Sequence, residues 1–195
     1  MKISSIVTLL AVISLAGCSD NRPDADVVEG LRGLYPGGSE FGAYSSRIVG
    51  RGSEIVPELI KASRDTDSKM RESAARCLGQ IATDEAVTRL IEMTSDDLIE
   101  ETIWIALSFA ASPRAIPTLQ AELASHADSR SRGRLLITLA ECGDASQLSA
   151  LLEYMKASKL EGHIYHANLV FEKLAGKRFN KDTKKIEEWL RERNA

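Results

Sequence analysis

Two histidines near the end of the chain are spaced as if to share a metal ion. His163 and His166 are three residues apart in a segment of helical periodicity, so a helix would place both on one face. Two imidazoles are fewer ligands than a metal site needs, and the nearest carboxylate, Glu161, lies where the helix would start. We therefore expect two solvent-facing histidines, and neither a metal nor any other cofactor.

Four carboxylates form a second candidate for chemistry: Asp96, Asp97, Glu100 and Glu101. General acid–base catalysis needs at least one carboxyl group whose pKa is raised by burial. Positions in a loop and at the start of a helix are wet, and negative charge there suits the helix dipole. The cluster predicts a structural role, and the alternative is an acidic patch that faces a partner.

No nucleophile motif is present in the sequence. Gly50–Ser53 lacks the third glycine and the preceding strand of a dinucleotide-binding loop, and Gly-x-Ser-x-Gly does not occur. Cys77 and Cys142 fall two repeats apart in the register described below, which is too far for a disulfide. We expect both cysteines to be buried small hydrophobes, and we expect no catalytic residue.

Basic residues gather in the second half of the chain. Residues 18–128 carry a net charge of −8 and residues 129–195 a net charge of +4. The basic side chains are either a solvated face or a contact for an acidic protein or anionic lipid headgroups. They form two groups, Arg130, Arg132 and Arg134 with Lys156 and Lys159, and then Lys177, Arg178, Lys181, Lys184 and Lys185. The overall net charge of −3 argues against a nucleic-acid partner.

These candidates must be positioned by an internal repeat. Three leucines each lie eleven residues after an aspartate and are followed, nine and twelve residues on, by aliphatic residues. The leucines are Leu78, Leu107 and Leu139, and the aspartates are Asp67, Asp96 and Asp128. Repeats of 29 and 32 residues cannot bury their own apolar faces, so they must stack on one another.

Each repeat is predicted to be a pair of helices. The clearest pair starts at Asp67, a plausible N-cap, and breaks at Thr83-Asp84; Gly79 would let neighbouring helices approach closely. The later breaks are at Ser112-Pro113 and Gly143-Asp144. The predicted fold class is all-α, an alpha-alpha superhelix of about four to five helix pairs over residues 39–176.

The best-formed unit resembles the short HEAT-like repeat of the phycobilisome lyase type. The resemblance is carried by the segments 67–71, 74–81 and 84–91, with Arg71 at the position of the family's arginine; Arg132 matches it in the third unit, whereas Glu100 replaces it in the second. It implies a curved solenoid whose second helices line the concave face. It also implies an interaction scaffold, or in a minority of members a pigment lyase or an enzyme-associated protein.

On that geometry, polar residues of the second helices form the expected binding surface. Mixed charge along such a ridge suits selective recognition of a protein partner, and the alternative is that these residues pair within their own helices. The predicted row is Glu58, Lys61, Arg89, Glu92, Thr118, Glu153 and Lys156.

The two ends of the chain read as additions to the repeats. Leu174 to Asp182 with Trp189 resembles a closing motif found after HEAT repeats in exported bacterial proteins, so residues 177–195 are predicted to be a capping helix. At the other end, Lys2 precedes an apolar run of the length of an export signal, residues 1–17. Residues 18–38 would form a tether with room for one short helix.

Leu15-Ala16-Gly17-Cys18 resembles the bacterial lipobox. The resemblance implies cleavage before Cys18, lipid on its thiol and, with Ser19 next, placement at the outer membrane facing the periplasm. We expect a lipid-anchored, non-catalytic scaffold for a protein partner in the bacterial envelope. The alternative is an enzyme or enzyme subunit related to the HEAT-repeat lyases.

Overall fold

The computed structural model describes residues 22–125 and 129–193, and every regular element in these ranges is a helix. Five pairs follow one another after a short first helix, α1 (Asp24–Glu29). The first helices of the pairs are α2 (Ser39–Val49), α4 (Ser68–Ile81), α6 (Glu100–Ala110), α8 (Ser129–Glu141) and α10 (Glu161–Ala175). The second helices are α3 (Val56–Ala62), α5 (Asp84–Glu92), α7 (Ile116–Ser125), α9 (Leu148–Ala157) and α11 (Thr183–Arg193). The fold is therefore an alpha-alpha solenoid, as predicted.

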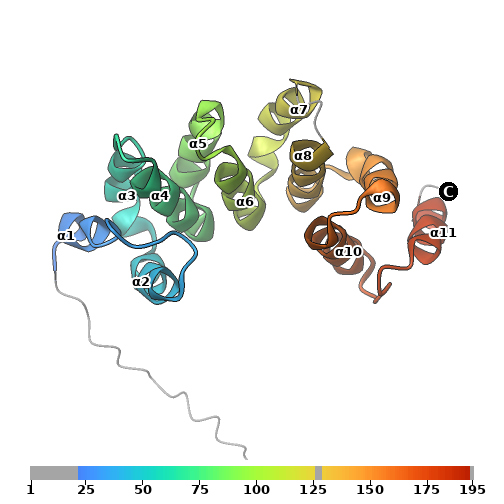
Figure 1. Ribbon diagram of the computed structural model, residues 1–195, viewed down its shortest axis with the longest axis horizontal. Helices are drawn as coiled ribbons and strands as arrows, with labels where there is room; N and C mark the ends of the chain where they lie inside the picture. The colour runs from blue at the N-terminus through green and yellow to red at the C-terminus, as the bar shows by residue number, and fades with distance from the viewer. Residues whose placement is uncertain (1–21, 126–128, 194–195) are drawn as a thin grey trace, which may run out of the picture.

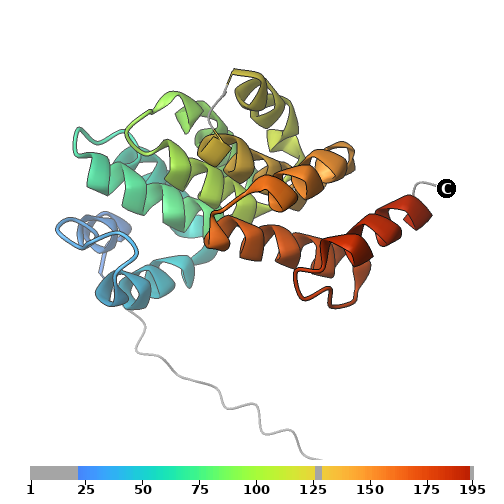
Figure 2. The same cartoon turned by 45° about the vertical axis from the view of Figure 1, so that its right-hand side comes forward.

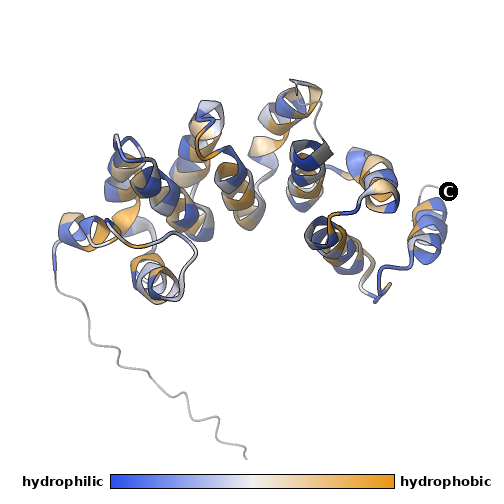
Figure 3. Cartoon of the chain, viewed as in Figure 1, coloured by the Kyte–Doolittle hydropathy of each residue, from blue (hydrophilic) through white to orange (hydrophobic). Residues whose placement is uncertain are grey.

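The two rows of helices form an arc, with one row inside the other. Figure 1 shows the second helices along the outer side of an arc and the first helices along its inner side. Both Figure 1 and Figure 2 show α4, α6 and α8 side by side, and α4 packs on α6 far more extensively than α3 packs on α5. The implication that second helices line the concave face is therefore wrong for this chain. Most helices carry apolar residues on one side only, and these sides pack together between the rows (Figure 3).

Close contact along the inner row explains the curvature. Gly79 of α4 lies so near α6 that a Cβ atom added to it would meet the carbonyl oxygen of Ala106 at 2.5 Å. Small residues at that contact let the two backbones approach, so the inner row is shorter than the outer one. The prediction made for Gly79 from the sequence is confirmed.

The same backbone turn ends the first helices of the three regular repeats. The residue four positions after each repeat leucine has a left-handed conformation: Ala82 (φ 57°), Ala111 (φ 47°) and Gly143 (φ 98°). A left-handed residue at this position ends the first helix and turns the chain toward the second helix. The 29- and 32-residue register read from the sequence is therefore also the register of the structure.

The start of the first helix differs between repeats. Asp67 is the N-cap of α4, with its carboxylate accepting a hydrogen bond from the Lys69 amide at 3.0 Å. Asp96 occupies the same repeat position, but α6 begins only at Glu100. Asp96 accepts a hydrogen bond from the Leu98 amide at 3.3 Å and shorter ones from Arg71 at 2.6 and 3.2 Å, and the Arg71 contact lowers the pKa of its carboxyl group. The family-type arginine therefore links one repeat to the next.

The core is continuous along the stack. Leu78, Leu107 and Leu139 have no exposed surface. Cys77 and Cys142 are free thiols buried among them, as expected, and burial raises their pKa values to about 12 and about 11 respectively. A thiol in such surroundings is a poor nucleophile.

Residues 24–34 are part of the folded unit. Val27 and Val28 of α1 and the following Leu31 are buried against the first pair, so this part of the expected tether covers the open end of the stack. Cys18 and the signal segment lie outside the described residues. Within the described ranges, no helix combines the length and apolar character needed to cross a membrane.

The closing segment packs on the last pair. Gly176 ends α10 in a left-handed conformation, and Phe179 and Ile186 are buried. Asp182 accepts hydrogen bonds from the Lys184 and Lys185 amides at the start of α11. Trp189 meets Phe171 edge to face, with 6.3 Å between ring centroids. These contacts are those of a cap over the apolar end of the stack.

Candidate functional site

The predicted row of polar residues lies on the outer helices, and its charges pair within those helices. Lys61 pairs with Glu58 at 3.6 Å, Arg89 with Glu92 at 3.0 Å and Lys156 with Glu153 at 2.9 Å. All three pairs join residues three positions apart, which was the alternative left open by the sequence. Such pairs contribute little free energy when exposed, roughly 0–1 kcal/mol.

Two members of the row also brace neighbouring helices. Arg89 donates hydrogen bonds to the hydroxyl and carbonyl oxygens of Ser63, at 2.7 and 3.0 Å. Lys156 reaches Glu187 of α11 at 3.2 Å, and Thr118 is half-buried on α7. The row remains a prediction as a binding surface, but the contacts of its charged residues are structural.

Exposed apolar side chains are distributed differently. Within the described ranges, none of the large, well-exposed ones lies on a second helix. Four lie on inner helices: Phe109 (66% exposed) on α6, and Tyr165 (51%), Leu169 (40%) and Leu174 (39%) on α10. Phe109, Tyr165 and Leu169 point away from the buried side of their own helices. Of the two rows of helices, the inner row therefore carries the well-exposed large apolar side chains of the described residues.

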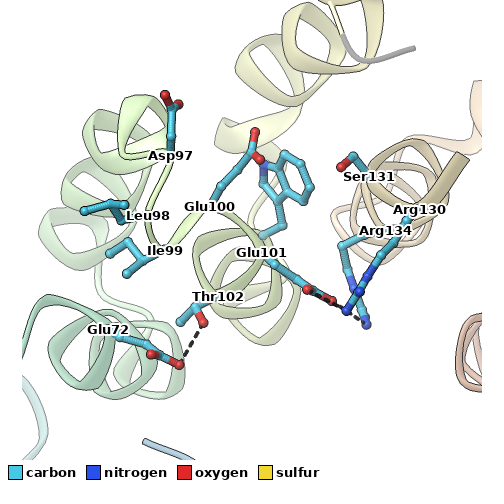
Figure 4. A pocket seen from close by; sticks show the side chains of 11 residues that line it. Glu72, Asp97, Leu98, Ile99, Glu100, Glu101, Thr102, Arg130, Ser131 and Arg134 are labelled. Carbon is cyan, nitrogen blue, oxygen red and sulfur yellow. Dashed lines mark hydrogen bonds and ion pairs between the residues drawn. The ribbon is translucent and has the colours of Figure 1, made fainter. Parts of the chain in front are cut away.

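A cleft of about 430 Å³ opens at the edge of this inner face, where α6 and α8 begin (Figure 4). Buried Trp104 and Ile99 line it together with exposed Leu98. Charged side chains stand on both sides of it: Glu72, Asp97, Glu100 and Glu101, and across from them Arg130 and Arg134. Three members of the acidic cluster and two members of the first basic group therefore line one cleft.

Glu101 connects the two sides. Its carboxylate pairs with Arg130 at 3.1 Å and lies 3.9 Å from Arg134, as the dashed lines of Figure 4 indicate. Farther along, Glu72 accepts hydrogen bonds from Thr102 at 3.1 Å and from Arg76 at 2.9 Å. These polar side chains therefore form a series of contacts that joins the starts of α4, α6 and α8.

The two histidines lie next to these polar side chains. Both were predicted to face solvent, but only His166 does. His163 is only 7% exposed, and its Nδ1 atom lies 2.7 Å from the Tyr154 hydroxyl. His166 is exposed and meets Tyr165 edge to face. Burial lowers the pKa of both imidazoles, and the nearby Arg134 guanidinium lowers both further.

These shifts predict that the protein loses stability as the pH falls below about 6.5. The unfolded state then takes up protons that folded His163 and His166 resist, so protonation favours unfolding until the folded pKa values are also passed. We expect the midpoint of chemical denaturation to fall between about pH 7.5 and about pH 5.5. His163→Gln should flatten this dependence, and an unchanged slope in that variant would contradict the assignment.

Residues 46–110 match the family model of HEAT repeats. The matched segment runs from the middle of α2 to the end of α6, so it contains the best-formed repeat and the Arg71–Asp96 link. HEAT repeats are typically scaffolds that mediate contacts between proteins, and this part of the chain is similar to them. No curated protein and no solved structure matches the chain significantly.

Sequence reasoning missed the inner-face residues of this helical stack. Phe109 and Leu169 look like ordinary members of apolar helices, and only the curvature shows which side of each helix stays open. The second basic group is mostly tied to the cap. Lys181 pairs with Glu161 at 3.1 Å, Lys185 with Asp182 at 3.4 Å, and Lys177 lies over the Phe179 ring.

Proposed function

We propose that the chain is a non-catalytic scaffold that holds a protein partner against its inner face, anchored to a bacterial membrane through lipid on Cys18. We choose the inner face as the binding face because the exposed apolar side chains Phe109, Tyr165 and Leu169 all lie on inner helices. The HEAT-repeat match supports the scaffold class. The lipobox-like Leu15-Ala16-Gly17-Cys18 supports the anchor, and Ser19 favours the outer membrane facing the periplasm.

A lyase-type enzyme or enzyme subunit was the alternative. It would need an accessible nucleophile, and burial of Cys77 and Cys142 raises the pKa of both thiols far above neutral pH. Most side chains that line the cleft are polar or charged. Such a lining is better suited to recognising a protein than to enclosing a small-molecule substrate, because small-molecule sites are mostly apolar.

The test is recovery of partners from detergent-solubilised membranes with tagged full-length protein. A Phe109→Ser/Leu169→Ser variant removes exposed apolar side chains from the inner face, so the fold should persist while the partner is lost. We expect at least a tenfold loss of bound partner, because exposed apolar anchors dominate such contacts.

A matched outer variant, Lys61→Glu/Glu153→Lys, changes two exposed charges and should retain the partner. Retention by the inner variant with loss by the outer one would assign binding to the second helices. Cys18→Ser tests the anchor separately, since the protein should then leave the membrane fraction. A variant that stays membrane-bound would contradict lipid attachment at Cys18.

A further inference from the structure

Four nitrogen-bearing side chains gather where α8 and α10 begin; Arg130 and His166 are exposed, whereas Arg134 and His163 are largely buried. Arg130 and Arg134 come from α8, and His163 and His166 come from the first turns of α10. Arg134 and the two histidines are close enough that the guanidinium charge disfavours protonation of both imidazoles. The group joins the basic side of the cleft to the neighbouring helix.

Arg134 is the centre of this group and is incompletely satisfied. Its side chain is only 13% exposed, yet it lines the cleft. Within the described residues its Nε atom is buried without a hydrogen-bond partner, and its ion-pair distance to Glu101 is 3.9 Å. A guanidinium group is built to hold a carboxylate with two parallel hydrogen bonds, and a buried N–H without an acceptor is costly. The Arg134 guanidinium group therefore has donor capacity beyond its long contact with Glu101.

Apolar surface adjoins the same place. Tyr165 lies against His166, with 5.6 Å between ring centroids, and Leu169 is one turn farther along α10. Both are exposed on the side of α10 opposite buried Ala167 and Phe171. An occupant that covers them must be apolar next to its charged group.

We propose that the inner face binds a segment of the partner protein that presents a carboxylate to Arg134 and His166, beside an apolar side chain that covers Tyr165 and Leu169. The inference rests on the proposed scaffold function and adds the chemistry of the partner. Charge complementarity favours a negatively charged partner group, because Arg134 is a cation and each histidine, once protonated, is a cation that donates from both ring nitrogens.

Glu101 acts as an internal competitor in this arrangement. It is 44% exposed and supplies the carboxylate that now lies nearest to Arg134. A partner carboxylate must displace it or share the guanidinium with it. Removing the Glu101 charge should therefore strengthen binding, whereas loss of an ordinary partner-facing residue would weaken it.

The proposed binding depends on pH because His163 and His166 can take up protons. His163 faces Tyr154 of α9, Arg130 and Arg134 of α8, and Glu101 of α6; His166 faces Arg134 and the Tyr165 ring. Burial and the Arg134 guanidinium lower the pKa of both imidazoles, so their uncharged forms predominate at neutral pH. A bound carboxylate favours the protonated form, so binding should tighten as the pH falls.

The experiment uses full-length protein in detergent micelles and a labelled peptide of about ten residues, with two aspartates set between leucines. Matched peptides carry asparagines or lysines in place of the aspartates. Fluorescence anisotropy should show the aspartate peptide binding about three- to tenfold tighter at about pH 5.5 than at about pH 7.5. His166→Gln should remove most of this difference, Arg134→Gln should lower the affinity at both pH values, and Glu101→Gln should raise it.

Thermal unfolding of each variant shows whether it is folded, and the exposed positions His166 and Glu101 keep the test valid if Arg134→Gln unfolds. Equal binding of the aspartate and asparagine peptides, tighter binding of the lysine peptide, or no binding at about 1 mM peptide would overturn the proposal. So would a preference for phosphatidylglycerol vesicles, which would make the face a membrane contact. If a partner is recovered through Phe109 and Leu169 but ignores Arg134, the scaffold function stands and this inference fails.

Discussion

Leu107→Ala is expected to lower the free energy of unfolding by about 2–5 kcal/mol. Leu107 has no exposed surface and lies in the middle repeat of the stack, where α6 meets both α4 and α8. Its backbone carbonyl oxygen accepts a hydrogen bond from the Cys142 thiol at 3.7 Å and another from the Ala111 amide at the end of α6. Truncation would leave a cavity that the packed neighbouring helices cannot fill.

Denaturant unfolding measures this loss, and hydrogen exchange locates it. Because each repeat contacts mainly its neighbours, amide protection should fall more in α4, α6 and α8 than in α11. Leu98→Ala is the matched control, since Leu98 is 78% exposed and should change stability by less than about 0.5 kcal/mol. A loss below about 1 kcal/mol for Leu107→Ala would mean that this leucine does not occupy the shared core.

Gly79→Ala is expected to destabilise the fold by about 2–3 kcal/mol, although alanine favours a helix over glycine by about 1 kcal/mol. The added Cβ would meet the oxygen, Cα and Cβ atoms of Ala106 at 2.5, 2.7 and 2.8 Å. Two of these are backbone atoms of α6, which cannot rotate away as a side chain can. The inner row must then spread at its tightest contact.

The matched control is Gly42→Ala in α2. A Cβ at Gly42 meets nothing within 4 Å, so the same substitution should raise stability by about 0.5–1 kcal/mol. The opposite signs of the two changes, measured as denaturation midpoints, test the close approach of α4 and α6. If both substitutions stabilise the protein, the inner row is looser than its geometry indicates.

The candidate site shows where sequence reasoning reached its limit. The acidic and basic groups were recognisable, because Glu101 and Arg130 belong to clusters of like charge in the chain. Their meeting across one cleft depends on how far α8 slides along α6, and a repeat register does not specify that. His163 was misjudged for a similar reason, since its burial comes from Tyr154 of the preceding helix.

The sequence by itself determined the helix pairs, their register and the breaks between the two helices of the regular pairs. Apolar periodicity and short-range signals such as Asp67, Thr83 and Gly143 act within one or two turns, so they can be read from neighbours in the chain. Only the tertiary structure decided which row faces inward. That choice depends on the spacing between repeats, set by contacts such as Gly79 against Ala106, and it moved the expected binding surface from the second helices to the first.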